Sequence, residues 1–419
     1  MQTFDVLLGE VVVGQLGRVQ SGKVLFRFTE EYRQLPYRPV LGQHFEDNLL
    51  KTYSGVREEL PAFFANLVPE GALRELLLYS LELTEGDDLQ LLAALGHDLP
   101  GAVRIRPSQA TTNLLDATAE PNGAVIETGV ADEEAVFRFS LAGVQMKFSL
   151  LKSNEKLLLP THNQQGDWIV KFDSDIYPGL VANEFATMEW ARAAGFEVPE
   201  CQVRPVSELP AELLSRVAPT GNVYLIKRYD RQGTIRIHQE DLAQVAGLRP
   251  SLKYEQWKYE TCARVIRAIC GVEGYEEFIR RLVFMVASGN TDAHLKNWSL
   301  LYPDGKRPVL TPLYDQVAVV AWPPPVASMK IEWALKFAGT KNLFHIDETT
   351  FERLAVLSGG DPTQIKRIVI EMLERLAESW KVGRIMELMP PKHVEALFNY
   401  WQRVPLLRTD FLQRVQMIY

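Results

Sequence analysis

Two polar side chains in the C-terminal half of the chain have the types and the spacing that phosphate transfer requires. Asp292 and Asn297 are the first and last residues of the run Asp-Ala-His-Leu-Lys-Asn. In kinase catalytic loops with this spacing, the Asp orients the attacking hydroxyl and the Asn amide oxygen binds Mg²⁺. The pattern therefore predicts a phosphotransfer site in which Asp292 is the catalytic residue.

The residues after Asn297 predict a β-hairpin that adds a second metal ligand. Residues 298–313 read as a strand, a tight turn at 303–305 and a returning strand. Because the two ends of a hairpin lie close together, we expect Asp315 beside Asn297, where both oxygen ligands would hold one Mg²⁺. Asp, Asn and Gly also gather in ordinary loops, and His294 alone would fit a structural role.

A lysine inside an apolar strand is a candidate for holding phosphates. Lys171 lies in the run Trp-Ile-Val-Lys-Phe, and buried lysines are rare unless they are paired. The lysine of the small lobe of protein kinases has this setting. Glu184 lies in a helix predicted over 180–195 and could pair with Lys171. In the alternative interpretation, Glu184 is a charge near a helix N-terminus and Lys171 reaches solvent from an edge strand.

Two further segments are candidates for contacts with a nucleotide. Residues 140–147, Ser-Leu-Ala-Gly-Val-Gln-Met-Lys, could form a turn whose backbone N–H groups cover phosphates, although they hold a single glycine. Residues 225–231 read as a strand that leaves a small lobe, and a hinge that contacts adenine would fall there. Within that strand, Asp230 and Arg231 fit a surface ion pair.

The composition is that of a folded protein and excludes several classes. The 419 residues are 47% hydrophobic and 23% charged, which suits two or three domains of roughly 150 residues. The net charge of −8 argues against nucleic acid as the main partner. Three cysteines without a CxxC pair favour neither disulfides nor a zinc ribbon and fit a reducing compartment. No apolar run is long enough to span a membrane, so we expect a cytoplasmic protein without membrane contact.

Composition and hydrophobic periodicity divide the chain into four parts. Mixed strand and helix patterns come first, and a polar stretch without periodicity follows. A mainly β segment with one helix is third, and the remainder is mostly helical except near 297–315. We assign these parts to an N-terminal subdomain at 1–107, a linker at 108–134, a small lobe at 135–235 and a C-lobe at 236–419. In the first part we expect strands within 3–28, helices at 61–80 and 86–96, and a strand at 101–107.

Taken together, these segments resemble the HipA family, the toxin kinases of bacterial type II toxin–antitoxin modules. The matching pieces run in order along nearly the whole chain: FFANLVPEG, LPGAVRI, FSLAGVQMKFSLL, WIVKF, NEF, KRYDR, HQEDLAQVAGL, TDAHLKNWSLLY and LTPLYD. The resemblance implies an α+β, two-lobed protein-kinase-like fold with an extra N-terminal α/β subdomain and a mainly helical C-lobe.

The resemblance also implies roles for individual residues. Asp292 would match the catalytic Asp, and Asn297 and Asp315 the Mg²⁺ ligands. Ser140 would match the serine whose autophosphorylation inactivates family members, because a phosphate adds roughly two negative charges beside a site meant for ATP phosphates. The residues that it implies for ATP binding are Lys171, Ser140, Ala142, Gly143, Val144, Gln145, Lys147, Lys227, Tyr229, His294 and Lys296.

The chain departs from the family pattern at two places. Val144 and Met146 stand where many members have Ala and Glu. The loss of the Glu at Met146 should alter surface chemistry more than the shape of the loop. Lys227 stands where many members have an acidic hinge residue. Adenine binding would then depend on backbone groups, with consequences for nucleotide affinity or selectivity.

The resemblance implies an ATP- and Mg²⁺-dependent Ser/Thr protein kinase that acts as a toxin and causes growth arrest. Its substrate would be a translation factor such as an aminoacyl-tRNA synthetase. Its partner would be a HipB-like DNA-binding antitoxin, through which alone it would reach DNA. One alternative is a small-molecule phosphotransferase, since antibiotic and lipid kinases also use Asp-x-His-x-x-Asn loops. Another is a catalytically silent pseudokinase that acts as a co-repressor.

Overall fold

The computed structural model describes residues 2–109, 115, 147–153, 156–159, 165–217, 221–324 and 331–416. Most of the predicted linker at 108–134 lies outside the described residues. The same holds for Ser140, Ala142, Gly143, Val144 and Gln145, so their predicted roles are not placed by the structure.

The N-terminal subdomain is an antiparallel sheet in the order β4-β3-β2-β1-β5, covered by short helices. Aromatic side chains from the sheet and helices, among them Phe26, Phe45 and Phe64, pack in its core. The strands are β1 (Thr3–Leu8), β2 (Val11–Arg18), β3 (Val24–Phe28), β4 (Tyr53–Ser54) and β5 (Val103–Pro107). The helices are α1 (Glu30–Arg33), α2 (Gln43–Glu46), α3 (Ala62–Ala65), α4 (Gly71–Ser80) and α5 (Asp88–Ala94).

The single helix predicted over 61–80 is wrong, because the chain leaves the helical path between α3 and α4. Pro69 disfavours a helical conformation at the residue before it and has no backbone N–H to donate. Gly71 then adopts a left-handed conformation with φ of 59°. From this break the Glu70 side chain reaches the C-lobe.

The small lobe is built on a second antiparallel sheet, with the strand order β7-β6-β8-β10-β9. Helix α6 (Leu180–Ala193) packs on one face, where Val181 and Met188 meet Tyr224 and Ile226. The strands are β6 (Lys147–Ser153), β7 (Lys156–Leu158), β8 (Trp168–Phe172), β9 (Cys201–Pro205) and β10 (Asn222–Lys227). Helix α7 (Ala211–Val217) packs on the sheet through Leu213. Strand β8 pairs on both sides, so it is not an edge strand.

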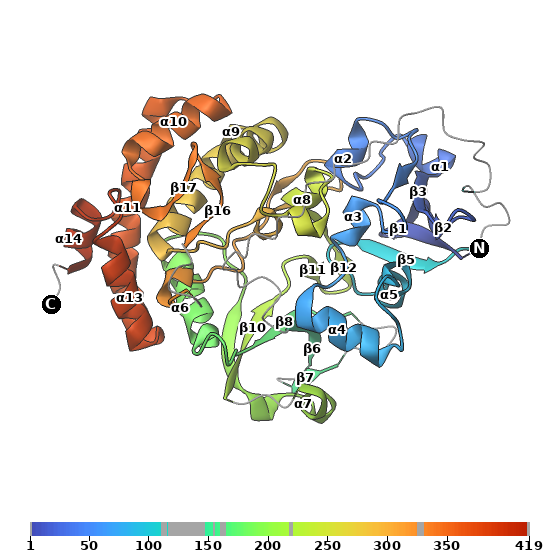
Figure 1. Cartoon of the computed structure of the whole chain (residues 1–419), viewed down its shortest axis with the longest axis horizontal. Helices are drawn as coiled ribbons and strands as arrows, with labels where there is room; N and C mark the ends of the chain where they lie inside the picture. The colour runs from blue at the N-terminus through green and yellow to red at the C-terminus, as the bar shows by residue number, and fades with distance from the viewer. Residues whose placement is uncertain are drawn as a thin grey trace.

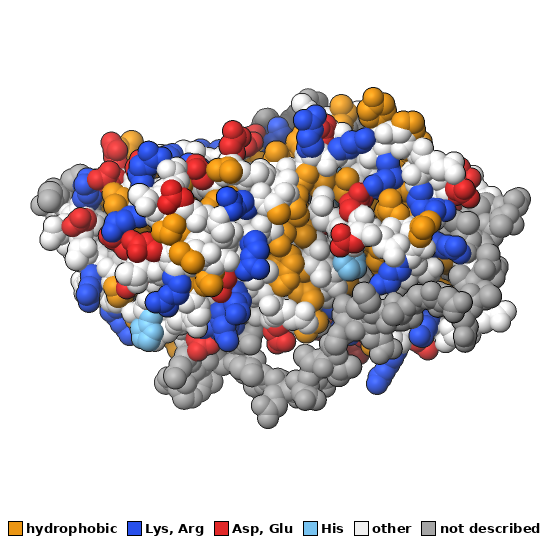
Figure 2. Space-filling view, turned by 90° about the horizontal axis from the view of Figure 1, so that it is seen from above, with side chains coloured by type: hydrophobic (Ala, Val, Ile, Leu, Met, Phe, Trp, Pro, Cys, Tyr) orange, Lys and Arg blue, Asp and Glu red, His pale blue; other side chains and the backbone are white. Residues whose placement is uncertain are grey.

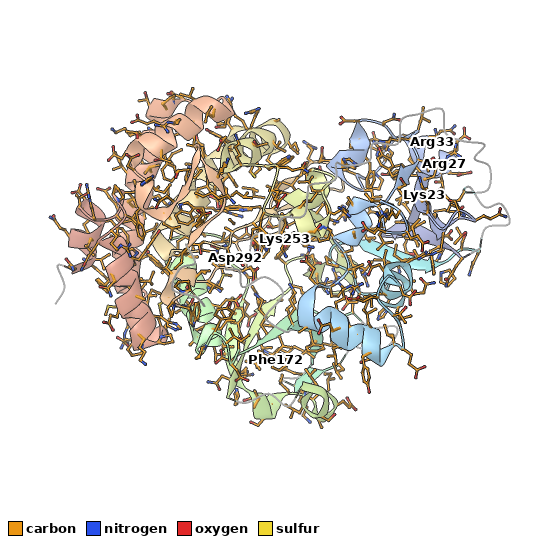
Figure 3. All side chains as sticks on the ribbon, in the orientation of Figure 1. Lys23, Arg27, Arg33, Phe172, Lys253 and Asp292 are labelled. Carbon is orange, nitrogen blue, oxygen red and sulfur yellow. The ribbon has the colours of Figure 1, made fainter. Side chains whose placement is uncertain are left out.

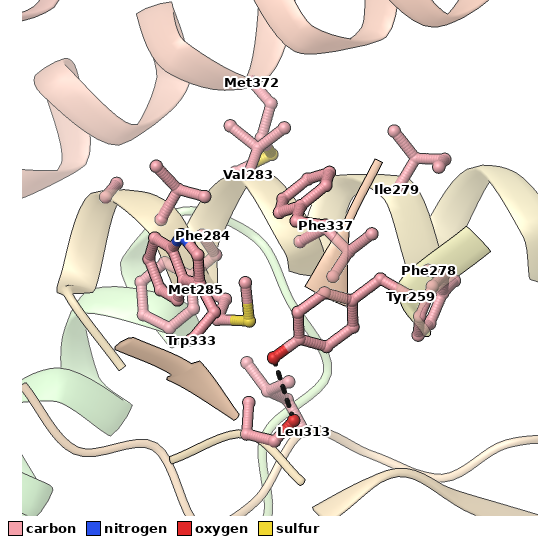
Figure 4. Packing of buried hydrophobic residues seen from close by; sticks show 14 of the residues in the cluster. Tyr259, Phe278, Ile279, Val283, Phe284, Met285, Leu313, Trp333, Phe337 and Met372 are labelled. Carbon is pink, nitrogen blue, oxygen red and sulfur yellow. Dashed lines mark hydrogen bonds between the residues drawn. The ribbon is translucent and has the colours of Figure 1, made fainter. Parts of the chain in front are cut away.

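The C-lobe is mainly helical, as predicted, and surrounds the long helix α9 (Tyr259–Ser288). Figure 4 shows Tyr259, Phe284 and Trp333 in this core. The Tyr259 hydroxyl donates to the Ala293 carbonyl, so the core also anchors the segment that carries Asp292. The other helices are α8 (Leu242–Val245), α10 (Glu348–Ser358), α11 (Pro362–Val382), α12 (Ile385–Leu388), α13 (Pro391–Trp401) and α14 (Asp410–Gln416).

The hairpin predicted over 298–313 is present. Strands β14 (Ser299–Tyr302) and β15 (Val309–Leu310) pair with Leu300 opposite Leu310, and the returning strand is shorter than predicted. Strand β13 (His238–Asp241) pairs with the other side of β14.

A second hairpin in the C-lobe was not predicted. It is formed by β16 (Glu332–Phe337) and β17 (Thr340–Asn342). Its longer strand, Glu-Trp-Ala-Leu-Lys-Phe, is short and carries a buried run, Trp-Ala-Leu, between two exposed charged residues. Periodicity cannot distinguish such a run from a piece of buried helix.

The N-terminal subdomain packs directly on the C-lobe, and Figure 1 shows it in blue against α8. Asn66 Nδ2 donates to the Leu248 carbonyl at 2.8 Å, and the backbone N–H of Gln43 donates to Glu240 Oε1 at 2.9 Å. Basic and acidic side chains are interspersed on the face seen in Figure 2. Among the described residues, no helix has the length and apolar character needed to cross a membrane.

Candidate active site

Lys171 lies at the centre of the site and joins the two lobes. It projects from β8, with 6% of its surface exposed, and its Nζ is 2.5 Å from Glu184 Oε1 and 2.5 Å from Asp315 Oδ1. Glu184, on α6, is completely buried. An edge-strand lysine that reaches solvent is therefore wrong, and so is a Glu184 that acts only as a charge near a helix N-terminus instead of pairing with Lys171.

The three charges change one another's pKa values. Burial alone would lower the pKa of Lys171, but the carboxylates of Asp315 and Glu184 raise it above its ordinary value, so the ammonium stays charged. Burial opposes ionisation of Asp315, yet Lys171 and Lys147 hold its pKa below the ordinary value. Burial raises the pKa of Glu184 despite the attraction of Lys171.

Asp315 and Asn297 are in direct contact, as the hairpin argument predicts. Asn297 Nδ2 donates to Asp315 Oδ2 at 2.6 Å, and Asn297 Oδ1 accepts from the backbone N–H of His294 at 3.1 Å. Asp315 adopts a left-handed backbone conformation with φ of 56°, which is uncommon outside glycine and clusters at functional sites.

Asp292 lies in the same loop and is half-buried. Its Oδ1 accepts a hydrogen bond from the Tyr254 hydroxyl at 2.8 Å. His294 is buried, and its Nδ1 has no hydrogen-bond partner in the part of the chain that the structure describes. Burial and the nearby charge of Lys253 lower the pKa of His294 to about 3, so its ring is neutral at physiological pH.

The profile of the HipA-like C-terminal domain matches residues 139–380, and that of the HipA N-terminal domain matches residues 4–106. The chain belongs to the HipA family. This is a family of kinase toxins, and membership confirms the resemblance seen in the sequence motifs.

Two relatives and one solved structure show how far the likeness extends. Y4dM of Sinorhizobium fredii is 35% identical over 413 residues, covering 96% of this chain and 97% of that protein. The serine/threonine-protein kinase toxin HipA of Shewanella oneidensis is 27% identical over 350 residues, covering 76% and 75%. The solved structure, HipA of Shewanella oneidensis MR-1 with HipB and operator DNA, superposes with a TM-score of 0.73 at 20% identity, covering 99% of this chain and 96% of that one. The kinase-like α+β fold is thereby confirmed.

The donor set of this HipA-family site fits the nucleotide and cation that its kinase relatives imply. A carboxylate and an amide, on Asp315 and Asn297, are hard oxygen ligands of the kind that Mg²⁺ takes. A cation held by both would replace their mutual hydrogen bond. Lys147 lies directly opposite Lys171 in the pairing of β6 with β8, so both cations stand on the same face of the sheet, where phosphates would be attracted.

The hinge of this HipA-family chain has fewer available backbone donors than the sequence suggests. Lys227 is exposed, and its N–H donates to the Glu200 carbonyl, while the N–H of Arg228 donates to the Asp167 carbonyl. Tyr229 donates its hydroxyl to Gln239 Oε1. Because both N–H groups already donate to backbone carbonyls, adenine would have to bind other backbone groups of the hinge.

Asp230 and Arg231 do not form the predicted surface pair. Both are buried, and the Asp230 carboxylate accepts from Arg228, from Arg231 and from the Gly101 N–H at 2.7 Å. Asp98 Oδ1 also accepts from both arginines, so the N-terminal subdomain is bonded to the hinge. Sequence reasoning missed this because the partners are about 130 residues away.

Three more residues at the site were not predicted: Glu70, Lys253 and Tyr254. Lys296, predicted to bind ATP, places its ammonium 3.0 Å from Glu70 Oε1 and 3.1 Å from the Asn66 carbonyl. The available signal for Glu70 was the Pro-Glu-Gly run, which interrupts an otherwise helical pattern.

Proposed function

We propose that this HipA-family protein is an ATP- and Mg²⁺-dependent Ser/Thr protein kinase that acts as the toxin of a toxin–antitoxin module. The observation that carries the proposal is the contact of Lys171 with both Glu184 and Asp315, which brings the Lys171 ammonium beside Asn297 and the loop of Asp292. Lys171, Glu184 and Asp315 form one contact network beside the loop of Asp292, which supports an active kinase over a catalytically silent co-repressor.

Each side chain has a distinct task in this proposal. Lys171 holds the phosphates and is itself oriented by Glu184. Asn297 and Asp315 hold Mg²⁺, which when bound neutralises phosphate charge. Asp292 orients the substrate hydroxyl and accepts its proton. His294 stays neutral beside them, so it adds no charge to the site.

The partners and the regulation follow from the family. The substrate is a Ser or Thr hydroxyl on a protein, for which a translation factor such as an aminoacyl-tRNA synthetase is the candidate. The antitoxin is a HipB-like DNA-binding protein, as in the complex of the Shewanella oneidensis homologue with HipB and operator DNA. Phosphorylation of Ser140, which lies outside the described residues, would inactivate the kinase.

Controlled expression in bacterial cells tests the toxin kinase. We expect wild-type protein to arrest growth and Asp292→Asn, at equal abundance, to leave growth unchanged. Phosphopeptides that appear only with the wild type would then identify the substrate. Equal arrest by both proteins would contradict a kinase mechanism of toxicity. Phosphorylation of added small molecules, without protein phosphorylation, would favour the small-molecule phosphotransferase.

A further inference from the structure

Glu70 of the N-terminal subdomain binds two lysines of the C-lobe at once. Its Oε2 is 2.5 Å from Lys253 Nζ, and its Oε1 is 3.0 Å from Lys296 Nζ. The Glu70 side chain is 32% exposed, and those of Lys253 and Lys296 are 10% and 16% exposed, so all three charges are largely shielded from solvent. Lys296 belongs to the catalytic loop itself.

Lys253 connects this carboxylate to Asp292 by a short path. The Lys253 carbonyl accepts from the backbone N–H of Leu295 at 3.1 Å. The next residue, Tyr254, donates its hydroxyl to Asp292 Oδ1 at 2.8 Å. Its ring packs edge-on against His294 with the centroids 5.0 Å apart. Figure 3 shows Lys253 and Asp292 near one another at the centre of the molecule.

The local fold of the N-terminal subdomain presents Glu70 to these lysines. The break between α3 and α4 leaves Glu70 in an extended conformation, with φ of −112° and ψ of 165°. Asn66, at the other end of the break, donates to the Leu248 carbonyl and accepts from Lys296 through its own carbonyl. The break is therefore fixed to the C-lobe at both ends.

We propose that Glu70 is a positioning residue for Asp292, acting through Lys253 and Tyr254, so that phosphotransfer depends on the N-terminal subdomain. The inference rests on the proposed kinase function. A carboxylate that must accept a proton has to be held within hydrogen-bond reach of the substrate hydroxyl. Tyr254 fixes one oxygen of Asp292, and Glu70 fixes the segment that carries Tyr254.

Kinetics of the wild type and three variants test the path. For the wild type, Glu70→Gln, Tyr254→Phe and the double variant, we measure single-turnover self-phosphorylation over a range of ATP concentrations. The rate constant at saturating ATP is taken as kcat, and the ATP concentration that gives half of this rate is taken as KM. Glu59→Gln is the matched control, because Glu59 also pairs across this interface, with Arg249 at 2.7 Å, but not with the catalytic loop. We expect Glu70→Gln to lower kcat about ten-fold with KM for ATP unchanged, and Glu59→Gln to match the wild type.

The double variant separates positioning from general destabilisation. If Glu70 acts through Tyr254, the double variant should be no slower than the slower single variant. If the reduction in kcat of the double variant equals the product of the two single reductions, Glu70 and Tyr254 act independently, and this would overturn the path. A rise in KM for ATP with unchanged kcat would also overturn it, because Glu70 would then support nucleotide binding.

Hydrogen–deuterium exchange tests the positioning without catalysis. In Glu70→Gln we expect the peptide that contains residues 290–297 to exchange faster than in the wild type. In Glu59→Gln we expect this peptide to exchange at the wild-type rate. If the wild type transfers no phosphate at all, the proposed function fails, and this exchange result still decides the positioning. Unchanged exchange in Glu70→Gln overturns the inference, whatever the activity of the wild type.

Discussion

Lys171 and Asp315 are 144 positions apart in the sequence, yet their Nζ and Oδ1 atoms are 2.5 Å apart. The contact joins the central strand of the small lobe to the residue that follows the C-lobe hairpin. Glu184 completes it from the helix of the small lobe. The two lobes are therefore in direct contact at the candidate active site through three charged side chains.

Replacing Lys171 with Met should abolish phosphotransfer and destabilise the protein. It leaves Glu184 buried without its cation, and breaking a buried pair from one side costs about 3–5 kcal/mol. Urea unfolding of Lys171→Met against the wild type measures the loss. The control is Lys156→Met, since Lys156 is exposed on the edge strand β7. Equal stability of Lys171→Met and Lys156→Met would show that the Lys171 pair contributes little.

Asp315→Asn should separate metal binding from backbone conformation. Asn tolerates the left-handed conformation that Asp315 adopts, so the fold should be retained. The lost carboxylate should remove the enhancement of ATP binding by Mg²⁺. Calorimetric titration with ATP, with and without Mg²⁺, measures it. An enhancement as large as that of the wild type would refute the metal role of Asp315.

Asp230→Asn should weaken the junction of the N-terminal subdomain with the hinge. Arg228 and Arg231 would lose part of their counter-charge in a buried setting, and we expect a loss of about 3–5 kcal/mol. Asp304→Asn is the control, because its pair with Arg307 is exposed and screened by solvent and should contribute much less. Chemical unfolding compares the two variants, and a loss no larger than that of Asp304→Asn would argue against the junction.

The contribution of Glu70 to stability should depend on pH. Burial opposes its ionisation, but Lys296 and Lys253 lower its pKa from 4.5 to about 2. A carboxylate whose pKa is lowered by folding stabilises the fold at any pH above its pKa in the unfolded state. It loses that contribution as the pH falls toward its pKa in the folded state. The difference in free energy of unfolding between the wild type and Glu70→Gln should therefore be largest above pH 4.5 and decrease toward pH 2. A difference that is constant over this range would contradict the ion pairs.

The sequence predicted the parts of the site that are close together along the chain. Asp292 and Asn297 share one loop, and a hairpin with a clear turn returns to Asp315. The pairing of Lys171 with Glu184 was left open, because the choice between an edge strand and a central strand depends on strand order. That order places β8 between β6 and β10 and is set by tertiary packing.

Contacts between the N-terminal subdomain and the lobes were beyond prediction for the same reason. Glu70 and Asp98 are ordinary surface residues by local pattern, and their partners are 183 and 130 residues away. The sequence shows a proline at position 69 that could interrupt a helix, but it does not show which contacts the break allows. Only the fold shows that it presents Glu70 to Lys253 and Lys296.

The most direct test of the account is mass spectrometry of purified protein after incubation with ATP and Mg²⁺. The wild type should gain one phosphate, at Ser140 by the family pattern, and Asp292→Asn should gain none while keeping the melting temperature of the wild type. Equal phosphate gain in both proteins, or none in either, would contradict the assignment of Asp292 as the catalytic residue of an active kinase.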